Sequence, residues 1–184
     1  MNLKTNLTVT NFRKGRGGNR IKYLVFHYTA GNGDTDEGNA KYFKSAYRGA
    51  SAHYFVDENS VTQVVRDGDT AWHCGDNQRY TNGGAKVKGI VTNRNSIGIE
   101  MCSDVINGRY VITPDTQKNA IELGKYLMKK YNIPLKNVYR HYDVTGKICP
   151  RPFVEDEVQW QTFKQNLGDD EVVDTVKVLL NGKE

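Results

Sequence analysis

Residues 21–27, IKYLVFH, form the apolar run from which the architecture of this chain follows. Aromatic and β-branched residues in a run of this length favour a short buried strand over a helix. The run ends at His27 and is followed by Tyr-Thr-Ala-Gly. A polar residue at the end of a core strand is well placed for chemistry, so His27 is a candidate site residue.

Elements of alternating type surround this strand. Strands are predicted at residues 53–57, 61–65, 96–102 and 137–141, and helices within 34–48, from Thr113 to about Tyr131, and at 155–167. The middle helix has the clearest start, because Thr113 offers a hydroxyl cap and Pro114 suits the first helical position. Residues 75–95 are rich in Gly, Asn, Lys and Arg and have no clear period, which indicates a long functional loop.

The composition is that of one globular domain with a short appendage. The chain has 184 residues, of which 38% are hydrophobic, 18 are Gly and only 4 are Pro. This excludes collagen-like, mucin-like and coiled-coil proteins, and no apolar run approaches the roughly 18 residues of a membrane span. The first residues carry no apolar signal core, so we expect a soluble protein without a signal peptide. Three Cys cannot pair completely, which indicates a reducing compartment and a free thiol.

The charge changes sign along the chain. Residues 1–150 hold 22 Lys and Arg against 13 Asp and Glu, whereas residues 151–184 hold 4 against 8. A basic body attracts polyanions, although the same charge can simply keep a domain soluble. No nucleic-acid motif or basic amphipathic helix is visible, so we expect no nucleic-acid partner and no membrane insertion. Residues 1–167 are the predicted domain, and residues 168–184 are an acidic linker, the start of a further module, or a terminal β-strand.

Three residues have the character of zinc ligands. His27 and His141 both follow strand-like runs, and Cys149 lies eight positions after His141. Hydrolytic zinc sites use three protein ligands and leave the fourth position to water, which a His₂Cys set satisfies. Two alternatives stay open: either histidine alone can be structural, and a fourth ligand, His53 or His73, would make the site purely structural. Cys74 and Cys102 are expected to be buried thiols.

Five segments occur in order along the chain: HYTAG, SAHYFVD, AWHCG, NSIGIE and HYDVTGKICPRP. Over about residues 20–165 the sequence resembles the zinc-dependent N-acetylmuramoyl-L-alanine amidases of the peptidoglycan-recognition-protein type, with phage endolysins and Gram-positive autolysins nearest. The resemblance implies an α/β fold, a central mixed β-sheet flanked by helices, with a zinc groove on one side. It also implies hydrolysis of the amide bond between N-acetylmuramic acid and L-alanine in bacterial peptidoglycan, leading to cell-wall lysis.

The resemblance also implies roles for individual residues. His27, His141 and Cys149 match the family's zinc ligands, Cys149 standing where many members have Asp. Glu100 matches the acid beside the attacking water, and Lys147 matches the basic residue that faces the scissile carbonyl. These five residues are therefore the predicted metal and catalytic set.

The predicted substrate-binding residues are His53, Trp72 and His73. Some phage members place a catalytic Tyr at the position of Ala52, so more of the acid role is expected to fall on Glu100. Trp72 and His73 are expected to line the groove, while Trp72 can equally be core and His53 can equally be a structural strand histidine.

A recognition module that holds a muropeptide without cutting it is the competing function. Non-catalytic relatives typically lose a metal ligand, often the Cys, whereas this chain keeps all three together with Glu100 and Lys147. The family also implies storage in the host cytoplasm before release, followed by action on the cell wall.

Overall fold

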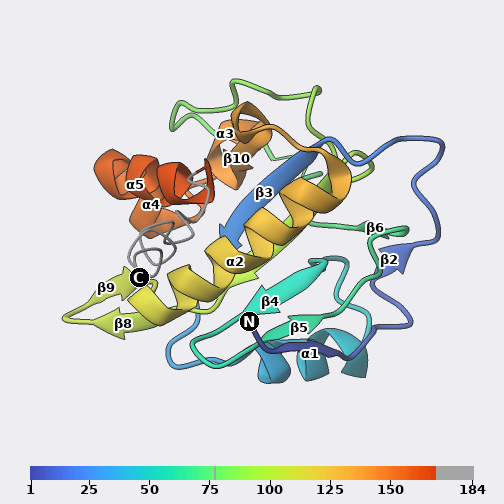
Figure 1. Ribbon diagram of the computed structural model, residues 1–184, viewed down its shortest axis with the longest axis horizontal. Coiled ribbons are helices and arrows are strands. Elements are labelled where there is room, and N and C mark those ends of the chain that lie inside the picture. The colour runs from blue at the N-terminus through green and yellow to red at the C-terminus, as the bar shows by residue number, and fades with distance from the viewer. Residues whose placement is uncertain (77, 169–184) are drawn as a thin grey trace, which may run out of the picture.

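The centre of the protein is a six-stranded mixed sheet in the order β1-β5-β4-β7-β3-β10 (Figure 1). This computed structural model describes residues 1–76 and 78–168, so the predicted linker, module or strand after Gly168 lies outside the described residues. The strands are β1 (Leu3–Thr5), β3 (Tyr23–Tyr28), β4 (Tyr54–Val56), β5 (Val61–Gln63), β7 (Ser96–Met101) and β10 (Val138–Arg140). Only β4 and β5 pair antiparallel within this sheet; the other neighbours are parallel. The predicted α/β fold with a central mixed sheet is confirmed.

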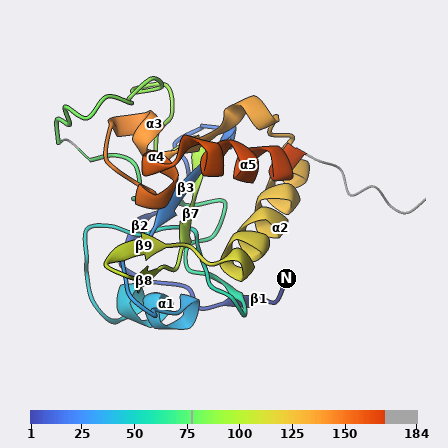
Figure 2. The ribbon, with the colours of Figure 1, turned by 90° about the vertical axis from the view of Figure 1, so that its left-hand side faces the viewer.

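Helices cover both faces of the sheet. They are α1 (Asp36–Ser45), α2 (Pro114–Tyr131), α3 (His141–Thr145), α4 (Arg151–Glu155) and α5 (Glu157–Gly168), with a short 3₁₀ helix at Leu135–Asn137. Helices α2 and α5 share one core with the sheet, whereas α1 packs on the opposite side (Figure 2). No helix in residues 1–76 and 78–168 has the length and apolar character needed to cross a membrane.

The alternation of side chains along β3 and β7 separates the core from the site. Leu24 and Phe26 on β3, like Ile97 and Ile99 on β7, lie in the core shared with α2 and α5. Successive residues of a strand point to opposite faces, so the intervening residues share the other face. These are Val25 and His27 on β3, and Ser96, Gly98 and Glu100 on β7. The two strands pair His27 with Glu100 and Val25 with Gly98, which places these residues side by side.

Several predicted boundaries need correction. The helix predicted at residues 155–167 is α5, which begins at Glu157. The short helix α4 before it was not predicted, and it ends at Asp156, whose backbone is extended (φ −127°, ψ 94°). The strand predicted to end at His141 ends at Arg140, and His141 begins α3.

Two small sheets were not predicted. They are β2 (Phe12–Arg13) paired with β6 (Thr70–Ala71), and β8 (Asp104–Ile106) paired with β9 (Arg109–Val111). The Asn107-Gly108 turn of the second hairpin has φ of 51° and 75°. Asn-Gly is a strong hairpin signal, so this hairpin was predictable from sequence.

The Gly- and charge-rich segment before β3 is an integral part of the fold. Arg16, in the middle of RKGRGGNR, is only 8% exposed. Its guanidinium donates to the carbonyl oxygens of Arg94 (3.0 Å) and Ser96 (2.9 Å). Arg16 therefore ties the first twenty residues to the start of β7.

Candidate metal centre and active site

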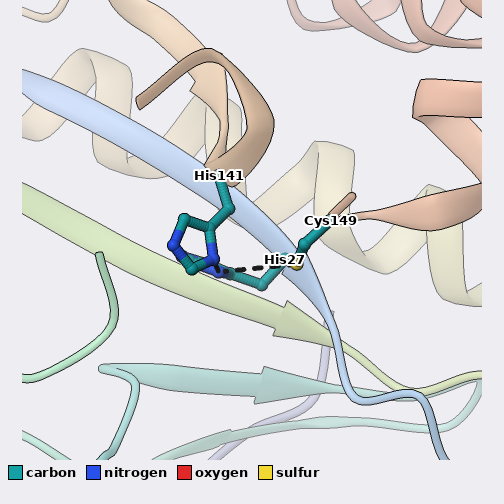
Figure 3. A group of neighbouring side chains, drawn as sticks. All are labelled: His27, His141 and Cys149. Atoms are coloured by element: carbon teal, nitrogen blue, oxygen red, sulfur yellow. Dashed lines mark hydrogen bonds between the residues drawn. The ribbon is translucent and has the colours of Figure 1, made fainter. Parts of the chain in front are cut away.

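The three predicted metal ligands come together from three separate pieces of the chain (Figure 3). His27 lies on β3 and His141 opens α3, which follows the neighbouring strand β10. Gly146 ends α3 with φ 89°, a left-handed conformation that glycine adopts without strain, and the chain then turns back. A hydrogen bond from Tyr142 N to Cys149 O (2.9 Å) holds Cys149 beside His141.

The spacing of the donor atoms fits a zinc ion. One donor atom from each of His27, His141 and Cys149 lies within 4.8 Å of the others, and all three residues are buried. The two Nδ1 atoms are 3.1 Å apart, and Cys149 Sγ is 3.8 Å from His27 Nδ1. Tetrahedral zinc, with bonds of about 2.0–2.1 Å to nitrogen and about 2.3 Å to sulfur, separates such atoms by about 3.3 and 3.6 Å. The residues therefore fit zinc.

Burial favours the neutral form of both histidines. It lowers the pKa of His27 well below the usual value, and the neighbouring His141 adds to this effect. Burial likewise lowers the pKa of His141, although Asp76 opposes the shift. Neutral imidazole is the form that binds a metal. Burial raises the pKa of the Cys149 thiol, so zinc binding would have to displace a proton from it.

Each histidine has a second polar partner at Nε2, on the side away from the other ligands. His141 Nε2 is 3.4 Å from Asp76 Oδ1, and Asp76 also accepts a hydrogen bond from the Tyr80 hydroxyl (2.8 Å). His27 Nε2 is 3.0 Å from His73 Nδ1. Such outer partners orient metal-binding histidines and raise their basicity.

Glu100 lies beside the donor group. Its Oε1 is 4.0 Å from His27 Nδ1. Among the described residues, Glu100 Oε2 is a buried oxygen without a hydrogen-bond partner. Burial raises the pKa of Glu100 to about 8, which nearby Lys147 partly opposes. A carboxyl group with a pKa near neutrality can both accept and return a proton.

A cleft of about 390 Å³ opens beside this group. Its lining includes the predicted residues Trp72, His73, His141 and Lys147, together with Asp76 and Asn93 from the long loop. Lys147 is exposed, so its ammonium group is available to a molecule in the cleft. The loop at residues 75–95 reaches the site through hydrogen bonds from Ala85 N and Val87 N to the carbonyl oxygens of Tyr142 and Asp143.

His53 is not in the cleft lining. It is fully buried, and its Nδ1 accepts a hydrogen bond from Gly98 N (3.0 Å) while its Nε2 is 2.8 Å from Arg16 Nη2. Burial, followed by the charge of Arg16, lowers the pKa of His53 to about 3. His53 thus lies just before β4 as a buried, hydrogen-bonded histidine, and its role in substrate binding stays a prediction. Cys74 and Cys102 are buried free thiols, as predicted.

Sequence reasoning did not single out three polar residues around the site. Asp76 contacts His141, and Ser96 contacts His73. Asn93 Oδ1 accepts hydrogen bonds from the backbone N–H groups of His73 (3.0 Å) and Cys74 (2.8 Å). Asp76 and Asn93 lie in a polar loop where nothing distinguishes them from their neighbours. Ser96 had a signal, because the strand face that carries Glu100 also carries Ser96.

Comparison with known proteins identifies the family. A family model described as N-acetylmuramoyl-L-alanine amidase matches residues 17–152. The chain is 34% identical over 152 residues to N-acetylmuramoyl-L-alanine amidase CwlL of Bacillus licheniformis, covering 80% of this chain and 41% of that protein. It is 34% identical over 143 residues to amidase CwlH of Bacillus subtilis (strain 168), covering 77% and 50%. This chain thus spans half or less of the length of these relatives.

Solved structures give the same result. The catalytic domain of XlyA matches with a TM-score of 0.71 and 31% identity, over 91% of this chain and all of that domain. The catalytic domain of PlyG matches with a TM-score of 0.73 and 27% identity, over 95% and 98%. The mixed sheet, its flanking helices and the sequence match therefore lead to one conclusion: this chain belongs to the N-acetylmuramoyl-L-alanine amidase family.

Proposed function

We propose that this chain is a zinc-dependent hydrolase that cuts the amide bond between N-acetylmuramic acid and L-alanine in bacterial peptidoglycan. The observation that carries the proposal is the three-donor group of His27, His141 and Cys149 with Glu100 beside it. The names of the relatives support the substrate. Storage in a host cytoplasm before release stays a prediction.

The donor set defines what the metal would contribute. Two imidazole nitrogens and one thiolate are ligands that zinc prefers. Zinc held there supplies Lewis-acid chemistry, which activates water at neutral pH and polarises a carbonyl oxygen.

Glu100 is the residue placed to move protons. We assign it to accept a proton from the attacking water and to return that proton to the leaving amine of L-alanine. Its Oε2, which lacks a hydrogen-bond partner among the described residues, is free to do so. General acid–base catalysis of this kind is worth typically 10²–10⁴-fold in rate.

Lys147 contributes charge. Its exposed side chain borders the same cleft as His141. We assign its ammonium group to the oxyanion that forms when the scissile carbonyl is attacked, where positive charge matters more than in the ground state. Trp72, which also lines this cleft, is assigned to substrate binding.

Two alternatives, a structural zinc site and a recognition module, would each need a site that differs from this one in one feature. A structural zinc site needs a fourth protein ligand, but His73 faces the Nε2 side of His27 and His53 contacts Arg16. A recognition module needs no proton-transfer group, whereas here an acid of raised pKa lies 4.0 Å from a ligand histidine. Both observations support the hydrolase.

Replacing Glu100 by Gln tests the proposal. We expect Glu100→Gln to keep its zinc and its affinity for cell-wall fragments, but to lose 10²–10⁴-fold in rate, because an amide cannot act as a base. The measurements are zinc content and the release of new L-alanine N-termini from purified cell wall. Glu37→Gln is the matched control, since Glu37 is half exposed on α1 and pairs with Lys4.

Two results would contradict this assignment. Near-native cleavage by Glu100→Gln would mean that another residue is the base. A wild-type protein that binds zinc and wall fragments but releases no L-alanine termini would be a recognition module.

A further inference from the structure

The ring of His73 lies against the face of β3 and β7 that carries His27, Ser96 and Gly98. It is 8% exposed, with Nδ1 3.0 Å from His27 Nε2 and Nε2 3.1 Å from Ser96 Oγ. His27 directs its other nitrogen, Nδ1, at His141 and Cys149. His73 therefore contacts the ligand His27 on the side opposite to the metal position.

The contacts run from His27 through His73 and Ser96 to the backbone carbonyl of Thr92. That carbonyl fixes the direction of every hydrogen bond in the series. The carbonyl oxygen of Thr92 can only accept, so the Ser96 hydroxyl, 2.6 Å away, donates to it. Ser96 Oγ then accepts from His73 Nε2–H. A neutral imidazole carries one ring proton, so His73 Nδ1 is an acceptor.

The same logic fixes the tautomer of His27. Since His73 Nδ1 accepts, His27 Nε2 must carry the proton and donate it. His27 Nδ1 is left with a free lone pair, directed at His141 and Cys149. This is the tautomer that a ligand of this geometry requires.

The position of the His73 ring is built independently of His27. A Cβ atom on Gly98 would lie 2.5 Å from His73 Cγ and 2.7 Å from its Nδ1, so the ring occupies space that only glycine leaves. The backbone N–H of His73 is held by Asn93 Oδ1 at 3.0 Å. The space for the ring and the position of the backbone are thus both set by contacts other than the one with His27.

We propose that His73 is a positioning residue which, through Ser96 and Thr92, holds His27 in the tautomer and ring orientation that present Nδ1 to zinc. This assignment rests on the zinc site of the proposed function. It goes beyond the expectation that His73 only lines the substrate groove, because its partner is a ligand.

The test compares two variants of nearly equal size. His73→Asn keeps an acceptor oxygen close to the place of Nδ1, whereas His73→Leu has none. Cys74→Ala is the control, because the sulfur of Cys74 is 3.9 Å from Ser96 Oγ but takes no part in the series of hydrogen bonds from His27 to Thr92.

Zinc affinity is measured by competition with a chelator. Long-range ¹H–¹⁵N NMR of the zinc-free full chain identifies which nitrogen of His27 carries the proton, and urea unfolding establishes that each variant folds.

We expect wild-type His27 to be protonated at Nε2 before zinc is added. His73→Leu should lose about 10–100-fold in zinc affinity, the usual cost of removing a residue that orients a metal ligand. It should also show mixed His27 tautomers, because His27 Nε2 would have no acceptor. His73→Asn should recover most of the affinity, and Cys74→Ala should change neither quantity.

A folded His73→Leu protein with wild-type zinc affinity and an unchanged tautomer would overturn the proposal. Equal losses in the Leu and Asn variants, with the tautomer unchanged, would also do so, because His73 would then act by packing alone. If His73→Leu does not fold, Ser96→Ala replaces it. We expect Ser96→Ala to lose zinc affinity a few-fold and to show mixed His27 tautomers. No change in the affinity or in the tautomer would contradict the proposal. A wild-type chain that binds no zinc would refute the proposed function, while its His27 tautomer would still decide the role of His73.

Discussion

His27 and His141 present the same ring nitrogen, Nδ1, to the donor group and direct Nε2 at different partners. The partner of His27 is another imidazole, and the partner of His141 is the carboxylate of Asp76. Asp76 has a pKa lowered to about 2, chiefly by its hydrogen bond with His141, so it is a carboxylate at neutral pH. Each ligand is therefore oriented by a group that the other ligand does not share.

Removing one ligand should release the metal. We expect Cys149→Ser to lose both zinc and activity, because two histidines alone are too few donors to hold zinc against water. Metal analysis after dialysis measures the loss. Cys102→Ser is the control, since Cys102 is also a buried free thiol but lies outside the donor group. Full zinc occupancy in Cys149→Ser would contradict the ligand assignment.

Asp67 is a buried carboxylate outside the metal group. Its Oδ1 accepts from the Tyr54 hydroxyl (2.6 Å), and its Oδ2 accepts from Lys130 Nζ (2.9 Å) and the Tyr131 hydroxyl (2.6 Å). Burial alone would raise the pKa of Asp67, but these hydrogen bonds outweigh it, so the pKa is lowered. Its contribution to folding is therefore present above the unfolded-state pKa of about 3.9 and is lost as the pH falls through the lower folded-state pKa.

Asp67→Asn should accordingly show a pH-dependent loss of stability. The free energy of unfolding should be lower than that of wild type at pH 7. The difference should shrink below about pH 4, because the wild-type carboxyl is protonated there in the unfolded chain, and at still lower pH in the folded protein. Urea unfolding at several pH values measures this. Glu155→Gln, at a mostly exposed position, should show little difference at any pH. A difference between Asp67→Asn and wild type that does not vary with pH would show that the charge is unimportant.

Helix α2 is the element that supports the site strands from behind. Its buried residues Ala120, Leu123 and Leu127 share the core of Phe26 and Ile99, the neighbours of His27 and Glu100 along β3 and β7. The helix starts as the sequence predicts, since the Thr113 side chain accepts from Thr116 N (3.4 Å) and Pro114 is the first helical residue. Loss of the Thr113 cap should therefore destabilise the sheet together with α2.

Thr113→Ala should lower the free energy of unfolding by about 0.5–2 kcal/mol, the usual cost of losing a side-chain cap. Thr113→Ser retains the hydroxyl and should lie close to wild type. Urea unfolding of the three proteins with zinc bound makes the comparison. Equal stability of the Ala and Ser variants would show that the hydroxyl does not cap α2.

Over the whole molecule, charge is concentrated in the part that carries the site. Residues 1–150 have 22 basic and 13 acidic residues, a net charge of +9. A surface of this sign attracts anionic cell-wall polymers, and salt screens the attraction over about 10 Å at 0.1 M. The excess positive charge should therefore strengthen binding to the cell wall and leave the rate of amide hydrolysis unchanged.

We expect lysis of cell walls to slow as salt rises from about 0.01 to 0.5 M, because the Debye length falls from roughly 30 Å to less than 10 Å. Turbidity of a wall suspension measures the rate. Hydrolysis of a small, uncharged muropeptide analogue is the control and should change little. Lysis rates independent of salt would mean that the charge only keeps the protein soluble.

Local patterns in the sequence determined the main strands and helices. The apolar runs at residues 21–27 and 96–102 became β3 and β7, and the cap at Thr113 marked the start of α2. These features are local, because strand periodicity and helix capping depend on residues a few positions apart. The family motifs supplied the three ligands, which the structure brings together.

The arrangement around the ligands was decided only by the tertiary structure. The contacts of His73 with His27 and Ser96, of Asp76 with His141, and of Arg16 with His53 join residues 23 to 65 positions apart. The parallel register of β3 and β7 sets which residues meet, since a shift of one residue would turn Glu100 and Gly98 into the core. Single-sequence periodicity contains no information on register between distant strands, and for that reason the residues that orient the ligands became visible only in the folded chain.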